Sequence, residues 1–175
     1  EDGRQNGGQL TIEDTNVLTS VFQIYYSVAA SGNLFHLKNC PNLNNVYIMA
    51  AAAIGISDSS IIIEDSHVAN SVYVFFRNDV INTPITFRNL YHDSGYHFIF
   101  QVKDGGVIDG GNVTMDNVTS MATKNTFDYR TKNGAHSNVH DSYFKTYVTF
   151  NGGHQGTDFR VIRNQFDAHL RFTGG

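Results

Sequence analysis

The clearest feature of the chain is a short run of alternating apolar residues that closes on Asn or Asp. Residues 10–14 read LTIED, and residues 85–89 read ITFRN. Alternation with a period of two points one side chain inward and the next outward along a β-strand. The pattern therefore predicts a short strand that returns about every 25 residues. Its closing positions are Asp14, Asn39, Asp65, Asn89, Asn117, Asp141 and Asn164.

Each copy is followed by a second alternating run, such as residues 46–48 (VYI) and residues 98–100 (FIF). Between the two runs lies a brief apolar contact, for example Val68 or Phe144, and after the second comes a variable loop rich in Gly, Asn, Ala and Asp. Three short strands per repeat, without any segment long enough for a crossover helix, predict a parallel β-helix. We expect one all-β domain of about seven coils, with the coils covering roughly residues 8–173 of 175.

Stacking of the coils places equivalent residues in columns, because neighbouring strands lie about 4.8 Å apart. The Asn and Asp residues are expected to form a turn ladder, since their side chains hydrogen-bond locally and tolerate unusual backbone angles. Two inward columns are expected to build the core. The first is Ile12, Leu37, Ile63, Phe87, Met115, Val139 and Ile162, and the second is Ile24, Ile48, Val74, Phe100, Tyr129, Phe150 and Phe172.

Composition narrows the function classes. Acidic residues outnumber basic ones by 16 to 12, a net charge of −4, which argues against a nucleic-acid partner. No apolar run approaches the roughly 18 residues of a transmembrane helix, so membrane insertion is not expected. The single cysteine, Cys40, excludes an intrachain disulfide and a multi-cysteine zinc site. The histidines show no metal-ligand spacing, so no metal site is expected.

Residues 112–119 (NVTMDNVT), the Asn column and the three-strand coil resemble the right-handed, pectin-lyase-like β-helix superfamily. That superfamily includes pectate lyases, polygalacturonases and the trimeric tailspikes of bacteriophages. The resemblance implies a right-handed coil, an extended polysaccharide as partner, and an extracellular or virion-associated location. The polar start and the end at Phe172 to Gly175, without a capping element, predict a segment of a longer protein. A homotrimer and further coils of the same chain are the alternative neighbours.

In the superfamily, the strand before the most variable loops usually lines the substrate groove, and the second strand of each coil holds that position here. Its outward positions carry aromatic rings among polar groups, which suits stacking against sugar rings. Burial against a neighbouring subunit or under loops would explain the same rings. The expected substrate-binding residues are Tyr47, Tyr73, Phe75, His97, Tyr147, His154, His169 and Arg171.

The same region offers candidates for catalysis. Two carboxylates several ångströms apart can act as general acid and base on a glycosidic bond, and Asp128 with Asp104 or Asp109 is the best candidate pair. Alternatively, Arg130 or Lys103 would serve as base in a lyase, with carboxylates holding a divalent cation such as calcium beside a uronate; otherwise no cofactor is expected. Asp128, residues 153–155 (GHQ) and Arg171 follow the order of the polygalacturonase motifs on successive coils.

The outward positions of the first strand differ, because their charges alternate in sign up the stack. This pattern predicts a structural charge ladder at Glu13, Lys38, Glu64, Arg88, Asp116, His140 and Arg163.

Two hypotheses follow for the function of the protein as a whole. One is a tailspike-like or pectinase-like protein that binds and cleaves a polysaccharide, favoured by long loops at residues 49–60 and 102–111. The other is a non-catalytic structural or adhesive β-helix, such as a fibre shaft or receptor-binding segment.

Overall fold

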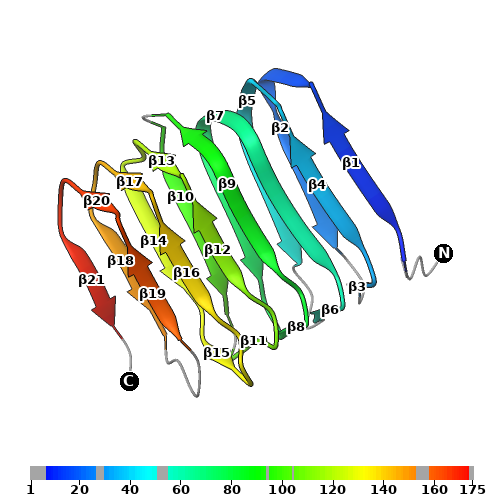
Figure 1. The fold of residues 1–175 in the computed structure, drawn as a ribbon. Coiled ribbons are helices and arrows are strands. Elements are labelled where there is room, and N and C mark those ends of the chain that lie inside the picture. Colours follow the sequence, from blue (N-terminus) through cyan, green and yellow to red (C-terminus); the bar gives the residue numbers. More distant parts are fainter. Residues whose placement is uncertain are drawn as a thin grey trace.

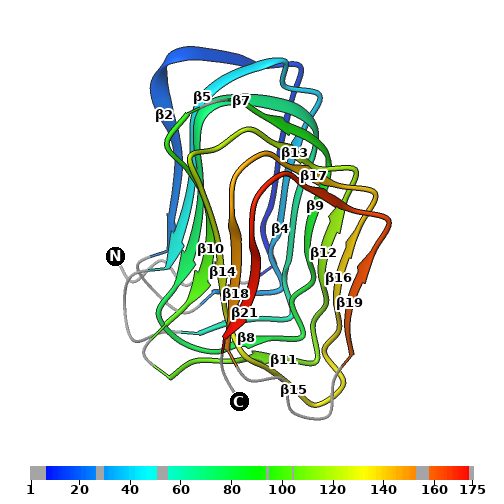
Figure 2. The same ribbon diagram turned by 90° about the vertical axis from the view of Figure 1, so that its left-hand side faces the viewer.

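The chain folds into a parallel β-helix. A computed structural model describes residues 7–26, 30–50, 55–93, 95–103, 105–152 and 158–173. The strands stack side by side from the N-terminal to the C-terminal end (Figure 1). The view turned by 90° shows the chain winding around a common axis (Figure 2). Every strand pair in the described part is parallel, and the pairing partners lie 22 to 28 residues apart, as in Leu43↔Val68 and Asp109↔Ile81. The predicted fold class is therefore confirmed.

The first face of the coil holds seven stacked strands, which make about six turns. They correspond to the predicted run that closes on Asn or Asp. The strands are β1 (Gln9–Glu13), β4 (Leu34–Lys38), the N-terminal half of β7 (Ser60–Phe76), β9 (Ile85–His92), β12 (Val113–Asp116), β16 (Ser137–His140) and β19 (Phe159–Ile162).

The second face carries the second predicted run, and short corner strands connect it to the first face. Its strands are β2 (Asn16–Tyr26), β5 (Asn42–Ala50), the C-terminal half of β7, β10 (His97–Val102), β14 (Lys124–Asp128), β18 (Val148–Asn151) and β21 (Leu170–Thr173). The corner strands are β13 (Thr119–Ser120), β17 (Tyr143–Phe144) and β20 (Gln165–Phe166), which stack on the end of β9.

A third face closes the coil within the segments that the sequence pattern assigned to variable loops. Each of its strands is two residues long and contributes one inward side chain, which is too short a run to give a visible alternation. The strands are β3 (Ala30–Ser31), β6 (Ile56–Ser57), β8 (Val80–Ile81), β11 (Ile108–Asp109) and β15 (Thr131–Lys132).

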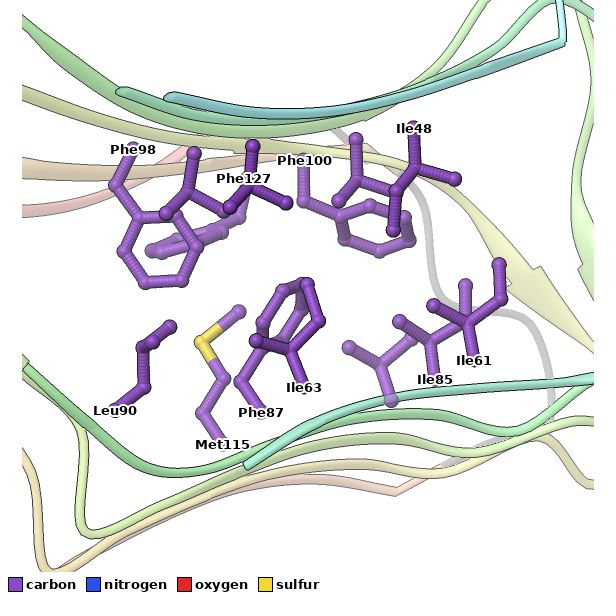
Figure 3. Close-up of a cluster of buried hydrophobic side chains, with 14 of the residues drawn as sticks. Ile48, Ile61, Ile63, Ile85, Phe87, Leu90, Phe98, Phe100, Met115 and Phe127 are labelled. Atoms are coloured by element: carbon purple, nitrogen blue, oxygen red, sulfur yellow. The ribbon is translucent and has the colours of Figure 1, made fainter. Parts of the chain in front are cut away.

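The core fills the space between the first two faces with aliphatic and aromatic side chains. Figure 3 shows Ile63, Phe87 and Met115 from the first face opposite Ile48 and Phe127 from the second. All five are fully buried. The rings of Phe87 and Phe98 meet edge to face across the core at a centroid distance of 5.3 Å. Such pairs add to the stabilisation that burial of apolar surface provides.

The second inward column differs from the prediction at one position. Phe127, and not Tyr129, pairs with both Phe100 and Phe150. The pattern failed here because the inward position before Phe127 is polar. Asn125 is buried, where it accepts a hydrogen bond from Ser120 Oγ (2.6 Å) and donates one to Thr146 Oγ1 (3.0 Å). Tyr129 is also buried, two residues further along the coil.

The last coil is shifted by one residue from the predicted register. Val161 pairs with Val139 and continues the inward column, whereas Ile162 pairs with His140 on the outside and is 45% exposed. Consequently Arg163, and not Asn164, takes the left-handed turn position, with φ 52°. Two adjacent apolar residues, Val161 and Ile162, made the register ambiguous in the sequence.

The predicted turn ladder is confirmed in the other coils. Its members adopt positive φ, a conformation that Asn and Asp tolerate better than other residues with a side chain. Asn89 donates a hydrogen bond to Asp65 (2.7 Å), and Asn117 donates one to Asn89 (2.9 Å). The members with left-handed backbone are Asp14, Asn39, Asp65, Asn89, Asn117 and Asp141.

Replacing Asn117 by alanine is expected to lower the free energy of unfolding by about 1–2 kcal/mol. The alanine would lose the hydrogen bond to Asn89 and would keep a strained backbone at φ 52°. Asn117→Gly is the matched control, because glycine loses the same bond without the strain. Urea denaturation of both variants measures the difference. Equal losses in the two variants would show that backbone conformation contributes nothing at this turn.

Candidate functional site

The outward side chains of the second face form three columns that run along the whole stack. The direct strand pairs fix this arrangement, since Tyr47 pairs with Tyr73 and Thr126 with Thr149. The first column is Val21, Asn45, Ser71, His97, Lys124, Tyr147 and His169. The second is Gln23, Tyr47, Tyr73, Ile99, Thr126, Thr149 and Arg171, and the third is Tyr25, Met49, Phe75, Gln101, Asp128, Asn151 and Thr173.

A shallow hollow of about 430 Å³ lies over the N-terminal coils of this face. The half-buried ring of Tyr73 is central to it. Tyr47 approaches that ring edge-on at a centroid distance of 5.9 Å, and Phe75 stacks beside it at 5.8 Å. These contacts hold the rings in place while leaving part of each exposed. The hollow is lined by Gln23, Tyr47, Met49, Ser71, Tyr73 and His97.

A second hollow of about 450 Å³ lies over the C-terminal coils of the same face. Tyr147, which is 44% exposed, provides its aromatic surface. His169 and Arg171 supply hydrogen-bond donors, and Thr149 and Leu170 complete the lining. The expected binding residues thus fall into two groups on one sheet. Tyr47, Tyr73 and His97 line the first hollow, with Phe75 beside Tyr73, and Tyr147, His169 and Arg171 line the second. His154 lies outside the described residues.

The expected catalytic carboxylates lie on different faces. Asp128 is half-buried on the second face, and its Oδ2 accepts a hydrogen bond from Gln101 Nε2 (3.5 Å). Asp109 lies on the third face, where it pairs with Lys132 (3.4 Å) and accepts a hydrogen bond from Asn133 (2.8 Å). Asp104 lies outside the described residues. Among the outward side chains of the three columns, Asp128 is the single carboxylate.

Arg130 follows β14 at the edge where the second face turns toward the third. Its guanidinium is exposed and donates a hydrogen bond through Nη2 to the backbone oxygen of Gly105. The side chain therefore lies along the edge of the face, one coil beyond the segment that contains Lys103.

One cluster in the described part of the chain has donor atoms close enough for a metal ion, and it lies on the first face and its turn. Single ligand atoms of Asp116, His140 and Asp141 lie within 4.8 Å of one another. However, Arg163 donates from Nε and Nη2 to the two oxygens of Asp141, at 2.6 Å each. The Arg163 hydrogen bonds, followed by that of His140, lower the pKa of Asp141 to about 2. The carboxylate of Asp141 is therefore paired with Arg163, and that of Asp116 with His140 (3.2 Å).

The first-face charge ladder is confirmed in its first four coils. Glu64 pairs with Arg88 (3.3 Å) and with His36 (2.8 Å), and Lys38 pairs with Glu13 (3.5 Å). In the last coil Ile162 stands where Arg163 was expected. Exposed ion pairs of this kind contribute little to stability individually, but the alternation avoids like charges on neighbouring coils.

Several residues of the second face escaped the sequence analysis, including Ser71 and Lys124. Both share a column with His97 and Tyr147, which the strand register reveals. The signal in the sequence was weak, because the polar residues between two apolar runs vary from one coil to the next.

Comparisons with protein-family models, curated proteins and solved structures give no significant match to this chain. The structure thus establishes the parallel β-helix fold, and the comparisons assign the chain to no particular family. Among the described residues there is no helix with the length and apolar character needed to cross a bilayer.

Proposed function

We propose that the second face binds an extended polysaccharide. The observation that carries the proposal is the continuous parallel sheet with an aromatic hollow near each end. Aromatic rings offer apolar faces to the C–H groups of sugars, and the neighbouring Gln, Ser, Thr, His and Arg side chains offer hydrogen bonds to hydroxyl groups. Exposed apolar surface of this kind marks a contact region more often than a bare solvent face.

The geometry of the stack fits a linear polymer better than a compact ligand. Successive coils repeat about every 4.8 Å, which is close to the length of one sugar residue in an extended chain. A polymer that runs along the columns would therefore meet similar groups from coil to coil. Tyr47 and Tyr73 would contact it at one end, and Tyr147 at the other.

The proposal concerns binding, because the described part of the second face offers one carboxylate. Hydrolysis by a general acid and base needs two, and Asp109 is held on another face by Lys132 and Asn133. A binding surface agrees with an adhesive role on a cell or virion exterior, which is the location we propose.

The experiment is incubation of the protein with a panel of bacterial capsular and plant polysaccharides. Retention in affinity electrophoresis measures binding, and the release of reducing ends, together with absorbance at 235 nm for unsaturated products, measures cleavage. Retention by at least one polysaccharide supports the proposal. Cleavage of a retained polymer would add a catalytic role and direct attention to Asp128. A protein that no member of the panel retains would contradict the proposal.

Replacing Tyr73 by alanine is expected to weaken binding of a retained polysaccharide by about tenfold, which corresponds to about 1.4 kcal/mol. The reason is that Tyr73 holds the rings of both Tyr47 and Phe75 in place. Tyr91→Ala is the control, since Tyr91 is also a surface tyrosine, 43% exposed, but lies at the corner against His67 and outside the hollow. Titration calorimetry with purified oligosaccharide measures both. If the two variants bind equally well, the aromatic hollow is not the contact.

A further inference from the structure

The described lysine and arginine side chains, apart from Lys145 at the corner after β17, divide into two groups by their partners. Away from the second face, Lys38, Arg88, Lys132, Arg160 and Arg163 each form an ion pair with a carboxylate. No ion pair found among the described residues involves the basic residues that lie on the second face or at its edge. These are Arg77, Lys103, Lys124, Arg130 and Arg171.

Three of these cations are aligned on consecutive coils. Val74, Phe100 and Phe127 pair directly with one another across the sheet. Each is followed, three residues later, by a basic residue at the edge between the second and third faces. The hydrogen bond from the Lys103 backbone nitrogen to the Phe76 oxygen (2.8 Å) continues the register up to this edge. Arg77 and Lys103 are therefore neighbours on adjacent coils, and Arg130 follows on the next coil, where its Nη2 donates to the backbone oxygen of Gly105, two residues after Lys103. All three side chains are exposed.

Such a stack of like charges is unfavourable by itself, because neighbouring coils are only about 4.8 Å apart. The same molecule avoids the problem on its first face, where Glu13, Lys38, Glu64 and Arg88 alternate in sign on consecutive coils. At the edge, the described acidic neighbour Asp79 uses its Oδ1 to accept the backbone N–H of Val107 (3.0 Å). No ion pair found among the described residues involves any of the three cations, so their positive charge is available to a bound anion.

We propose that this edge binds the acidic groups of the polysaccharide, that is, carboxylates or sulfates carried on successive sugars. The proposal rests on the proposed function, since it takes the second face to be the polymer site. Arg77 and Arg130 present planar guanidinium groups that can form paired hydrogen bonds with a carboxylate or sulfate. The Arg77 guanidinium also lies 5.9 Å from the centroid of the Phe75 ring, so the cationic edge is continuous with the aromatic hollow.

The experiment compares two triple variants that each remove three positive charges. R77Q/K103Q/R130Q removes the edge cations, and K38Q/R88Q/R160Q removes three cations that are paired elsewhere. Calorimetric titrations at low salt use a galacturonate hexasaccharide, a heparin hexasaccharide, maltohexaose and a single-stranded DNA oligonucleotide. The galacturonate and heparin arms distinguish carboxylate from sulfate recognition. Inorganic sulfate is a fifth probe, for which the readout is the shift in Tm.

We expect the wild type to bind at least one of the two acidic hexasaccharides. The affinity of the edge variant for that sugar should be lower by about tenfold or more. The control variant should stay within about twofold of the wild type. Sulfate should raise the Tm of the wild type and of the control more than that of the edge variant. Screening by added salt should weaken the acidic interaction.

Four outcomes would overturn the inference. Equal losses in both triple variants would show a general charge effect, and equal or tighter binding of the DNA would show a different class of ligand. Binding of maltohexaose as tight as that of the acidic sugars, unchanged in the edge variant, would leave the proposed function standing and remove the acidic specificity. If no sugar of either kind binds, the proposed function fails. The edge is then tested by sulfate alone, and an equal Tm shift in the edge variant and the wild type excludes an anion site.

Discussion

Replacing Phe127 by alanine is expected to lower the free energy of unfolding by about 3–5 kcal/mol. The ring is fully buried and contacts three other rings. The centroid distances are 5.3 Å to Phe98, 5.0 Å to Phe150 and 6.1 Å to Phe144. Removing the ring leaves a cavity between the first and second faces, and the pairing of each coil with its neighbours prevents the faces from closing around it.

The matched control is Phe172→Ala, in the same column of the stack. Phe172 is 54% exposed, so the same truncation should cost less than half as much. Chemical denaturation followed by circular dichroism gives both values. A similar loss in the two variants would contradict the register in which Phe127, rather than Tyr129, continues the column of Phe100 and Phe150.

The fold could be predicted from the sequence because the alternating apolar residues return with a period of about 25 residues, which a parallel β-helix explains. The first-face column and the Asn ladder were correct through Asp141, since each coil there has one apolar alternation and one turn residue. The predicted register was wrong where the apolar alternation itself is broken, either by a buried polar residue or by two adjacent apolar residues. Buried Asn125 hid the inward position before Phe127, and the adjacent Val161 and Ile162 allowed two registers. The third face was missed because its strands are two residues long.

The candidate site could be predicted only in part, for a different physical reason. Tyr47, Tyr73 and Phe75 were identifiable because exposed rings on a strand are conspicuous in an alternating pattern. Relations between coils are set by strand register and not by position in the chain. That Asp109 lies on a separate face from Asp128, and that Arg77 aligns with Arg130, follows from the pairing of strands about 25 residues apart. Loop lengths vary between coils, so counting residues does not give this alignment.

Lowering the pH from 7 to 4 is expected to reduce the free energy of unfolding by about 3 kcal/mol through a single side chain, His92. The imidazole is fully buried at the corner of the coil, where Nε2 lies 3.1 Å from the backbone oxygen of Asn70 and the ring stacks on Phe98. Its Nδ1 has no hydrogen-bond partner. Burial is the main cause that lowers the pKa of His92 from 6.5 to about 4, and the nearby His67 acts in the same direction, whereas the Asn70 hydrogen bond and Asp93 oppose it.

The direction follows from proton uptake. Between pH 6.5 and 4 the unfolded chain binds a proton at this histidine and the folded chain does not, so stability falls as the pH falls. Each unit of difference in pKa corresponds to about 1.4 kcal/mol. The loss of stability begins as the pH falls below about 6.5 and is nearly complete at about pH 4. The carboxyl of Asp141, with its pKa lowered to about 2, affects stability only at lower pH.

Urea denaturation at a series of pH values tests this expectation in the wild type and in His92→Phe. Phenylalanine keeps an aromatic ring against Phe98 and cannot titrate, so the variant should lose most of the pH dependence above pH 4 even if it is less stable at pH 7. His169→Gln is the control, because His169 is exposed on the second face and its removal should leave the profile unchanged. A His92→Phe profile that parallels the wild type would show that the acid sensitivity arises elsewhere. Loss of the dependence would place the acid-sensitive point of the coil at the corner between its first two faces, away from the proposed polysaccharide-binding columns.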